Sequence, residues 1–202
     1  MAGLVLRKWC PENATHTIFC PLNLRRRLRW VVFWLALALL AGWSWQSWRE
    51  RRFDPCILAA AHRYQVDPAL LKAVIWQESR FFPHSRGGKG ELGLMQISDA
   101  VAQEWARDAH VSPFEHLACL DPATNTLAGA WYLNKLLQRY QETDNPAAYA
   151  LADYNAGRKN VLRWINGAAA TRSQVFLEQI DFPFTRAYVG AILRRADHYR
   201  PM

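Results

Sequence analysis

Residues 30–48 are the feature that most constrains this chain. They read WVVFWLALALLAGWSWQSW and contain no charged residue. A helix of this length is about long enough to cross the ~30 Å hydrocarbon core of a bilayer. Arginines flank the run on both sides (Arg25, Arg26, Arg27, Arg29, Arg49, Arg51 and Arg52). Tryptophans, which favour membrane–water interfaces, lie toward its two ends (Trp30, Trp34, Trp43, Trp45 and Trp48). The sequence therefore predicts a single N-terminal transmembrane helix.

Two other interpretations of this run are a buried core helix and a cleaved signal peptide. A core helix of a water-soluble protein rarely lies between two arginine clusters. A signal peptide has a short basic region and a small-residue cleavage site, whereas a long segment precedes this run and bulky tryptophans end it. The excess of arginine before the run predicts a cytoplasmic tail over 1–29, an anchor over 30–48 and an extracytoplasmic domain over 49–202.

The charge distribution argues against a nucleic-acid partner. The formal charge of the chain is +8, but residues 1–52 contain nine Lys/Arg and two acidic residues, whereas residues 53–202 contain sixteen and fifteen. The outer domain is thus nearly neutral, and a nucleic-acid-binding domain needs a basic face. No Cys or Cys/His spacing is typical of a zinc site.

The outer domain has the sequence pattern of an all-α fold. No segment alternates with a period of two, and Asp-Pro pairs at 54–55, 67–68 and 121–122 each offer an N-cap acceptor followed by proline. Ser98 and Asn145 offer further helix starts, and Gly157 and Gly167 further helix ends. The predicted helices lie near 55–65, 68–80, 99–108, 122–141, 146–156, 158–166, 173–179 and 184–200.

Residues 81–97 form a glycine-rich loop that ends in the apolar sequence GLMQI. Structureless loops of this length in compact domains are usually functional or disordered, and the apolar end favours function. Cys56 and Cys119 both precede predicted helices in an oxidising compartment. They form either a disulfide or two separate buried thiols.

Glu78 is the strongest candidate for chemistry. Leu71, Val74, Ile75 and Glu78 follow the i, i+3, i+4, i+7 spacing of one helix face. Glu78 therefore points into the domain near the C-terminal end of its helix, where burial and the helix dipole both raise a carboxyl pKa. A carboxylic acid protonated near neutrality suits a general acid. The alternative is a structural glutamate paired with an arginine.

Four ordered motifs give the chain a family resemblance. They are Glu78-Ser79, the segment 93–96 (GLMQ), the segment 152–157 (ADYNAG) and the segment 185–189 (TRAYV). In this order and at these spacings, they resemble the soluble lytic transglycosylases, lysozyme-like enzymes that cleave peptidoglycan. The resemblance covers residues 55–200 and implies a lysozyme-like helical domain. Two departures are Glu91, where the family often has alanine, and Asp153, where it has alanine before the Tyr-Asn pair.

The resemblance implies a role for each matching residue. Glu78 is the catalytic acid/base, and Ser79 helps to orient the glutamate or the substrate's N-acetyl group. The remaining residues contact the glycan (Met95, Gln96, Tyr154 and Asn155). No cofactor or metal is implied, and the expected partners are peptidoglycan strands and, through residues 30–48, the membrane.

The resemblance also implies the reaction. Most glycosidases use two carboxyl groups, but the motif supplies only Glu78. The substrate's own N-acetyl and 6-hydroxyl groups would then replace the second, so that the MurNAc–GlcNAc bond is cleaved without water and a 1,6-anhydro-MurNAc end forms. The alternative enzyme is a goose-type lysozyme-like hydrolase that uses Glu91 or Asp153 as the second carboxylate. A non-catalytic glycan-binding or scaffold protein would tolerate loss of Glu78, which this chain has kept.

Overall fold

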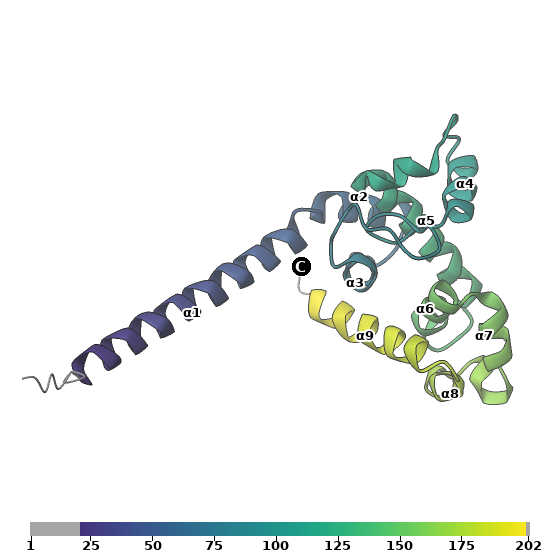
Figure 1. Ribbon diagram of the computed structural model, residues 1–202. Coiled ribbons are helices and arrows are strands. Elements are labelled where there is room, and N and C mark those ends of the chain that lie inside the picture. Colours follow the sequence, from purple (N-terminus) through teal and green to yellow (C-terminus); the bar gives the residue numbers. More distant parts are fainter. Residues whose placement is uncertain (1–20, 201–202) are drawn as a thin grey trace, which may run out of the picture. The chain divides into compact units, whose positions relative to one another are not determined.

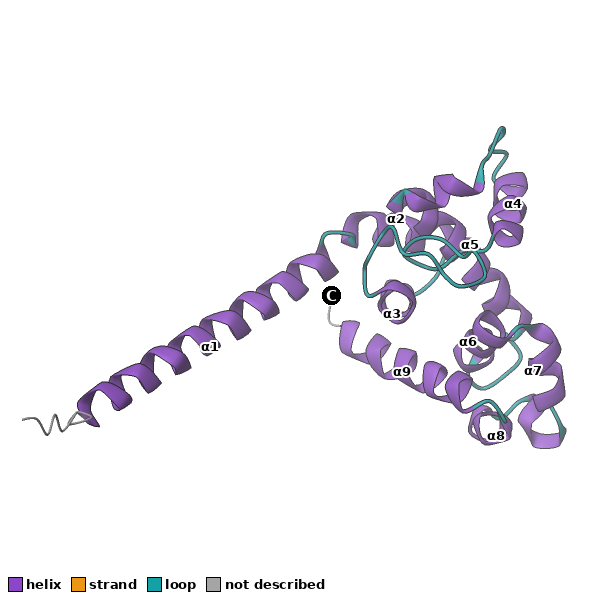
Figure 2. Ribbon diagram, viewed as in Figure 1, coloured by secondary structure: helices purple, strands orange, loops and turns teal. Residues whose placement is uncertain are grey.

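The computed structural model describes residues 21–200, with side chains from residue 25 (Figure 1). The chain divides into two units, Met1–Trp45 and Gln46–Met202. In the described part of the chain, every regular element is helical, as the sequence predicts (Figure 2).

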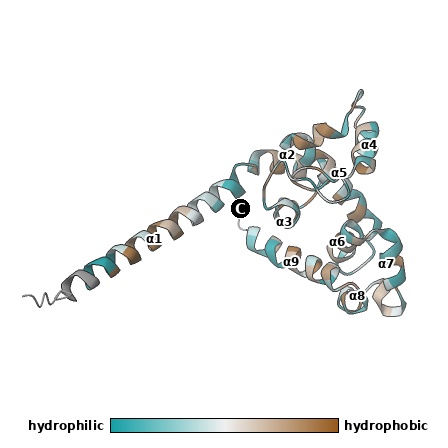
Figure 3. Ribbon diagram, in the orientation of Figure 1, coloured by the Kyte–Doolittle hydropathy of each residue, from teal (hydrophilic) through white to brown (hydrophobic). Residues whose placement is uncertain are grey.

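The first helix, α1 (Pro21–Arg51), contains the charge-free run. Its apolar side chains are exposed rather than packed in a core, with Leu39 75% and Trp43 70% accessible. Figure 3 shows the hydrophobic middle of this helix between hydrophilic ends. By length and composition it is the one helix among residues 21–200 that could cross a membrane, a property that signal sequences share.

The second unit contains eight α-helices in its described residues, and each lies where the sequence predicts one. They are α2 (Asp54–Tyr64), α3 (Pro68–Ser79), α4 (Asp99–Asp108), α5 (Pro122–Arg139), α6 (Pro146–Ala156), α7 (Arg158–Trp164), α8 (Ser173–Gln179) and α9 (Pro183–Tyr199). Two short 3₁₀ helices, η1 (His116–Leu120) and η2 (Gly167–Ala170), were not predicted.

Side-chain caps explain three of these helix starts. The Asp67 carboxylate accepts from Ala69 N–H at 2.8 Å, Ser98 Oγ from Val101 N–H at 3.4 Å, and Asp121 from Thr124 N–H at 2.8 Å. Two sequence-based expectations were wrong. Phe53 occupies the N-cap of α2, so Asp54 lies inside the helix, where its carboxylate accepts from the Lys72 ammonium at 2.6 Å. Asn145 precedes α6 as the sequence predicts, although its side chain makes no cap hydrogen bond. Gly167 begins η2, and α7 has already ended at Trp164.

The core lies between two helix pairs. Helix α3 packs along α9, and α2 packs along α5, while α6 contacts both α5 and α9. The α3 face predicted to be internal is fully buried, with Leu71, Val74 and Ile75 all 0% exposed. This packing fixes the wall on which Glu78 lies.

The loop between α3 and α4 is ordered by one buried side chain. Asn125 of α5 accepts from Met95 N–H at 2.7 Å and donates to the carbonyls of Leu92 and Cys119 at 2.8 and 2.7 Å. Gly93 has φ +78°, and a Cβ there would lie 2.3 Å from Asn125 Nδ2. Glycine is therefore required at this position, because the loop backbone comes so close to α5.

The two cysteines of this unit are separate free thiols, and of the two Cys119 is buried whereas Cys56 is partly exposed. Cys56 Sγ donates to the Phe53 carbonyl at 3.0 Å, and Cys119 is fully buried. Burial raises the pKa of the Cys119 thiol to about 11, so it behaves as a small apolar side chain.

Candidate active site

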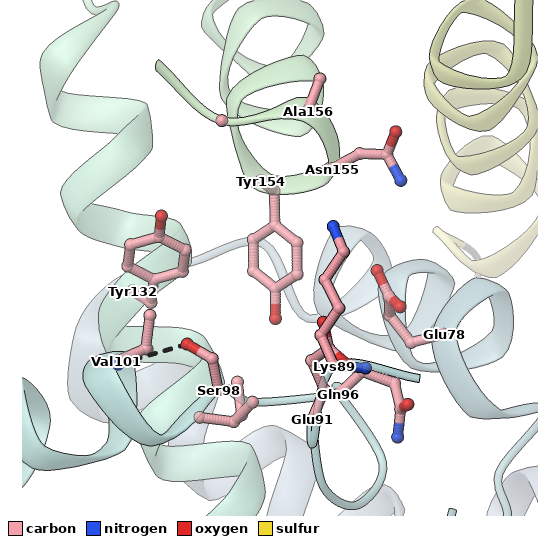
Figure 4. A pocket seen from close by; sticks show the side chains of 12 residues that line it. Glu78, Lys89, Glu91, Gln96, Ser98, Val101, Tyr132, Tyr154, Asn155 and Ala156 are labelled. Carbon is pink, nitrogen blue, oxygen red and sulfur yellow. Dashed lines mark hydrogen bonds between the residues drawn. The ribbon is translucent and has the colours of Figure 1, made fainter. Parts of the chain in front are cut away.

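A cavity of about 510 Å³ opens beside the end of α3 (Figure 4). It is lined by residues of α3, α4, α5, α6 and the glycine-rich loop, namely Glu78, Lys89, Glu91, Gln96, Ile97, Ser98, Val101, Tyr132, Tyr154, Asn155, Ala156 and Gly157. Four of the sequence-predicted residues therefore meet here, although they come from three separate segments of the chain.

Glu78 is half-buried at the wall of this cavity. Burial, which disfavours the charged form, raises the pKa of its carboxyl to about 7, and the negative charge of Glu91 acts in the same direction. The sequence predicted this shift from the apolar face of the helix. At neutral pH, the group can thus give up a proton and take it back.

Tyr188 of α9 holds the Glu78 carboxyl. Its hydroxyl donates to Glu78 Oε1 at 2.5 Å, and this hydrogen bond partly offsets the effect of burial on the Glu78 pKa. Burial and the Glu78 charge raise the pKa of the Tyr188 phenol well above its ordinary value, so it remains a donor. Sequence reasoning included Tyr188 in a motif but gave it no role. The signal was its place on the inward face of the last helix, together with Thr185 and Ile192.

Tyr154 and Asn155 of α6 line the cavity, and both are anchored. The Tyr154 hydroxyl donates to the Met95 carbonyl at 2.8 Å, and its ring lies 5.4 Å from that of Tyr132. The Asn155 side-chain oxygen accepts from the Thr185 hydroxyl at 2.8 Å. The second hydrogen bond leaves the Asn155 amide nitrogen available as a donor toward a ligand.

The loop residue Gln96 also lines the cavity, with its amide nitrogen donating to the carbonyls of Ser85 and Gly93 at 3.2 and 2.8 Å. Its backbone is in the left-handed region, with φ +49°. Gln96 thus fixes the loop from within and presents its remaining surface to the cavity.

Ser79 and Met95 do not line the cavity. The Ser79 hydroxyl is buried and donates to the Ile75 carbonyl at 3.2 Å, one turn back along α3. Met95 is 0% exposed, and its sulfur packs where a Cβ of Gly129 would otherwise lie. Its apolar side chain packs in the core. Met95 contributes to the site through its backbone carbonyl, which accepts the hydrogen bond from the Tyr154 hydroxyl. The Met95 side chain, predicted to contact glycan, is thus placed in the core and not in the cavity wall.

The two rival carboxylates differ in position. Asp153 is 2% exposed and lies away from the cavity, where it accepts from Arg139 and from the Tyr140 hydroxyl, each at 2.7 Å. Glu91 does line the cavity, and its Oε2 accepts from Lys89 N–H at 3.0 Å. A Cβ at Gly87 would lie 2.3 Å from the same oxygen. The Glu91 carboxylate therefore closes the tip of the loop that carries Lys89.

Together, these contacts define a groove with one acid/base, Glu78, whose pKa lies near 7. Tyr188 orients its carboxyl, and hydrogen-bonded polar side chains line the cavity beside it. The whole arrangement is typical of an enzyme that transfers a proton to and from its substrate.

Comparison with known proteins agrees with this geometry. The family described as "Transglycosylase SLT domain" matches residues 55–177. A soluble lytic murein transglycosylase of Escherichia coli is 31% identical over 169 residues, which are 81% of this chain and 26% of that protein. A membrane-bound lytic murein transglycosylase C of Actinobacillus pleuropneumoniae is 30% identical over 75% of this chain and 43% of its own length.

Solved structures give the same result. The 70 kDa soluble lytic transglycosylase of Escherichia coli superposes with a TM-score of 0.67 at 28% identity, over 82% of this chain and 27% of that one. The chain belongs to the transglycosylase SLT domain family, and its second unit has the lysozyme-like helical fold. It spans about a quarter of the length of the soluble relatives that it matches.

Proposed function

We propose that this protein is a peptidoglycan lytic transglycosylase that uses Glu78 as its sole acid/base. The observation that carries the proposal is the Glu78 carboxyl itself, with a pKa of about 7, a hydrogen bond from Tyr188 and a position in the wall of the cavity. The family membership of residues 55–177 supports the same reaction.

In the proposed reaction, the Glu78 carboxyl protonates the oxygen that links the anomeric carbon of MurNAc to GlcNAc, and that C–O bond breaks. The substrate's N-acetyl group stabilises the anomeric carbon. The MurNAc 6-hydroxyl oxygen then bonds to the anomeric carbon, and its proton passes to the Glu78 carboxylate. The acid is thereby restored, water is not consumed, and the product ends in 1,6-anhydro-MurNAc.

We propose that the glycan contacts Tyr154, Asn155 and Gln96 directly, because all three line the cavity with Glu78. Ser79 and Met95 act indirectly. Ser79 is bonded within the last turn of α3, beside Glu78, and the Met95 carbonyl fixes the Tyr154 hydroxyl.

The hydrolase alternative now depends on Glu91. Asp153 is committed to Arg139 and Tyr140, whereas Glu91 lines the cavity. The contact between Glu91 and Lys89 N–H favours a structural role for this carboxylate.

Mass spectrometry of a peptidoglycan digest tests the proposal. We expect fragments lighter by one water than those from a lysozyme, without new reducing ends, and the same products from a Glu91→Ala variant. Mainly reducing-end products from the wild-type protein would overturn the transglycosylase assignment. Their loss in Glu91→Ala would identify Glu91 as the second carboxylate.

We further propose that residues 30–48 anchor the protein in the inner membrane, with residues 49–202 in the periplasm, where peptidoglycan lies. The exposed apolar surface of α1 and the membrane-bound relative support this topology. A reporter fused after Met202 should read as extracytoplasmic, and the full chain should sediment with membranes. A cytoplasmic reading would contradict the topology.

A further inference from the structure

Outside the cavity, α3 and α9 hold a cluster of cations around one tryptophan. The guanidinium carbons of Arg80 and Arg195 lie 3.2 and 3.7 Å from the centre of the Trp76 ring. Two guanidinium groups this close to one ring centre occupy its opposite faces, because they would overlap on the same face. Arg194 and His198 join Trp76 and Arg195 around a second cavity, of about 430 Å³. We call Trp76, Arg80, Arg194, Arg195 and His198 the α3–α9 basic cluster.

No ion pair neutralises the positive charge of this cluster within the described residues. Between residues 25 and 200, no carboxylate forms an ion pair with Arg80, Arg194 or Arg195, and the nearby Asp197 is paired with Arg200 at 2.5 Å. Burial and the Arg195 charge lower the pKa of the Arg80 guanidinium. Like charges repel at this range, so an anion that bridges them is the complementary ligand.

The cluster faces away from the proposed catalytic cavity. Trp76 and Glu78 are two positions apart on α3, which turns their side chains about 200° from each other around the helix axis. None of the five cluster residues lines the Glu78 cavity. The glycan in the groove is therefore not the ligand that the cluster fits.

The cluster is instead close to the end of α1. The Arg195 guanidinium lies 5.8 Å from the centre of the Tyr199 ring, and the Tyr199 hydroxyl donates to Glu50 at 3.1 Å. Glu50 follows the end of the charge-free run by two residues. If that run spans a bilayer, chain connectivity keeps Glu50 at the bilayer surface, with the cluster within a few side chains of it.

We propose that the α3–α9 basic cluster binds the phosphate headgroups of anionic phospholipids at the membrane surface. The proposal rests on the membrane anchoring proposed above. Arginine guanidinium groups recognise phosphate oxygens in pairs, and an arginine–aromatic surface suits the interfacial layer of an anionic membrane. Binding would hold α9 against the bilayer. Because Tyr188 of α9 also holds Glu78, binding would orient the groove toward the cell wall.

Thermal unfolding of the full chain in neutral detergent micelles tests this proposal, because a ligand that binds the folded state raises Tm. We expect Tm to rise with the mole fraction of phosphatidylglycerol but not with phosphatidylcholine. In Arg80→Gln/Arg194→Gln, reaching the same rise should need at least fivefold more phosphatidylglycerol. The double lysine variant at the same positions should fall between the two. Arg158→Gln/Arg172→Gln, which removes two exposed arginines elsewhere, is the matched control.

Several outcomes would overturn the proposal. These are a Tm unaffected by phosphatidylglycerol, an unchanged response in Arg80→Gln/Arg194→Gln, or an equal rise with inorganic phosphate, which would indicate a free-phosphate site. If the double variant is poorly folded by circular dichroism, Arg194→Gln alone carries the test, because this side chain is exposed. The glutamine variants should cleave soluble glycan fragments like the wild type, and a tenfold loss would indicate a substrate site. Glu78→Gln should lose cleavage but keep the lipid response, so failure of either proposal is distinguishable.

Discussion

Two regions of this domain each direct an acidic side chain inward, but they provide it with different partners. In the α5–α6 region, Asp153 meets both Arg139 and the Tyr140 hydroxyl at 2.7 Å. In the α3–α9 region, the Glu78 carboxyl receives one hydrogen bond among the described residues, from Tyr188. Burial raises the Glu78 pKa to about 7, and no ion pair with a described residue compensates its charge.

The comparison shows that the partners of a carboxyl, rather than its burial, separate a structural acid from a reactive one. A guanidinium that neutralises Asp153 also fixes it, so that removing one partner leaves an uncompensated charge. Glu78 has a neutral donor instead, and it is oriented without losing its ability to exchange a proton.

The largest effect is expected from Glu78→Gln on catalysis. Glutamine preserves the shape of the side chain but cannot donate the proton, so cleavage of purified peptidoglycan should fall by about 10³-fold or more, roughly 4 kcal/mol in activation free energy. Muropeptide release measures this, with circular dichroism as the check on folding. Activity within tenfold of the wild type would remove Glu78 from its role.

Asp153→Ala should act on stability instead. It leaves Arg139 and the Tyr140 hydroxyl without their acceptor, and breaking a buried pair in this way costs about 3–5 kcal/mol. Urea unfolding measures the loss of free energy. At temperatures where the variant remains folded, the pH profile of cleavage should match that of the wild type. A shifted profile would mean that Asp153 takes part in the chemistry.

The stability of Glu78→Gln should depend on pH with a defined sign. Folding raises the pKa of this carboxyl from its ordinary value of 4.5 to about 7, so the folded state binds the proton more tightly. The Glu78 contribution to stability therefore falls as pH rises from about 4.5 to 7, and the full cost above pH 7 is about 3 kcal/mol. The glutamine variant should be more stable than the wild type at pH 8, and the difference should shrink toward pH 4.5. A constant difference would contradict the raised pKa.

The smallest effect is expected from Tyr188→Phe. Its hydroxyl stabilises the ionised Glu78 carboxyl, so its removal should raise the Glu78 pKa and move the alkaline limb of the activity profile to higher pH. Loss of orientation should lower kcat by about tenfold, the order expected for one misaligned hydrogen bond. The control is Thr185→Val. This substitution is on α9, like Tyr188→Phe, but it removes the hydrogen bond to Asn155 and should leave the pH profile of cleavage unchanged.

Much of the fold could be predicted from the sequence, because local signals determine it. Asp67, Ser98 and Asp121 do cap their helices, and the apolar face of α3 is buried as its spacing indicates. Asp54 failed as a cap because a distant residue, Lys72, provides it with a stronger partner. Caps depend on the next few residues, whereas an ion pair across two helices leaves no such local pattern.

The site was only partly predictable, for the same reason. The raised pKa of Glu78 follows from its own helix, but its hydrogen bond comes from Tyr188, 110 residues later in the chain. Met95 was assigned to the groove from a motif, yet its side chain fills the space beside Gly129. Motifs identify the segment that forms a site, but they do not separate a side chain that contacts a ligand from one whose backbone supports a neighbour.

The fit between Gly87 and Glu91 has a consequence for descent within the family. A side chain at position 87 would displace the Glu91 carboxylate from its hydrogen bond to Lys89 N–H, since the two would meet at 2.3 Å. The two positions are therefore expected to covary. Lineages that keep a glutamate at 91 should retain glycine at 87. Lineages with alanine at 91 lose one of two constraints on that glycine, because a Cβ at position 87 would still lie 2.8 Å from Gln96 Oε1. A substitution at position 87 or 91 of the loop tip is therefore expected to change which residues are tolerated at the other position.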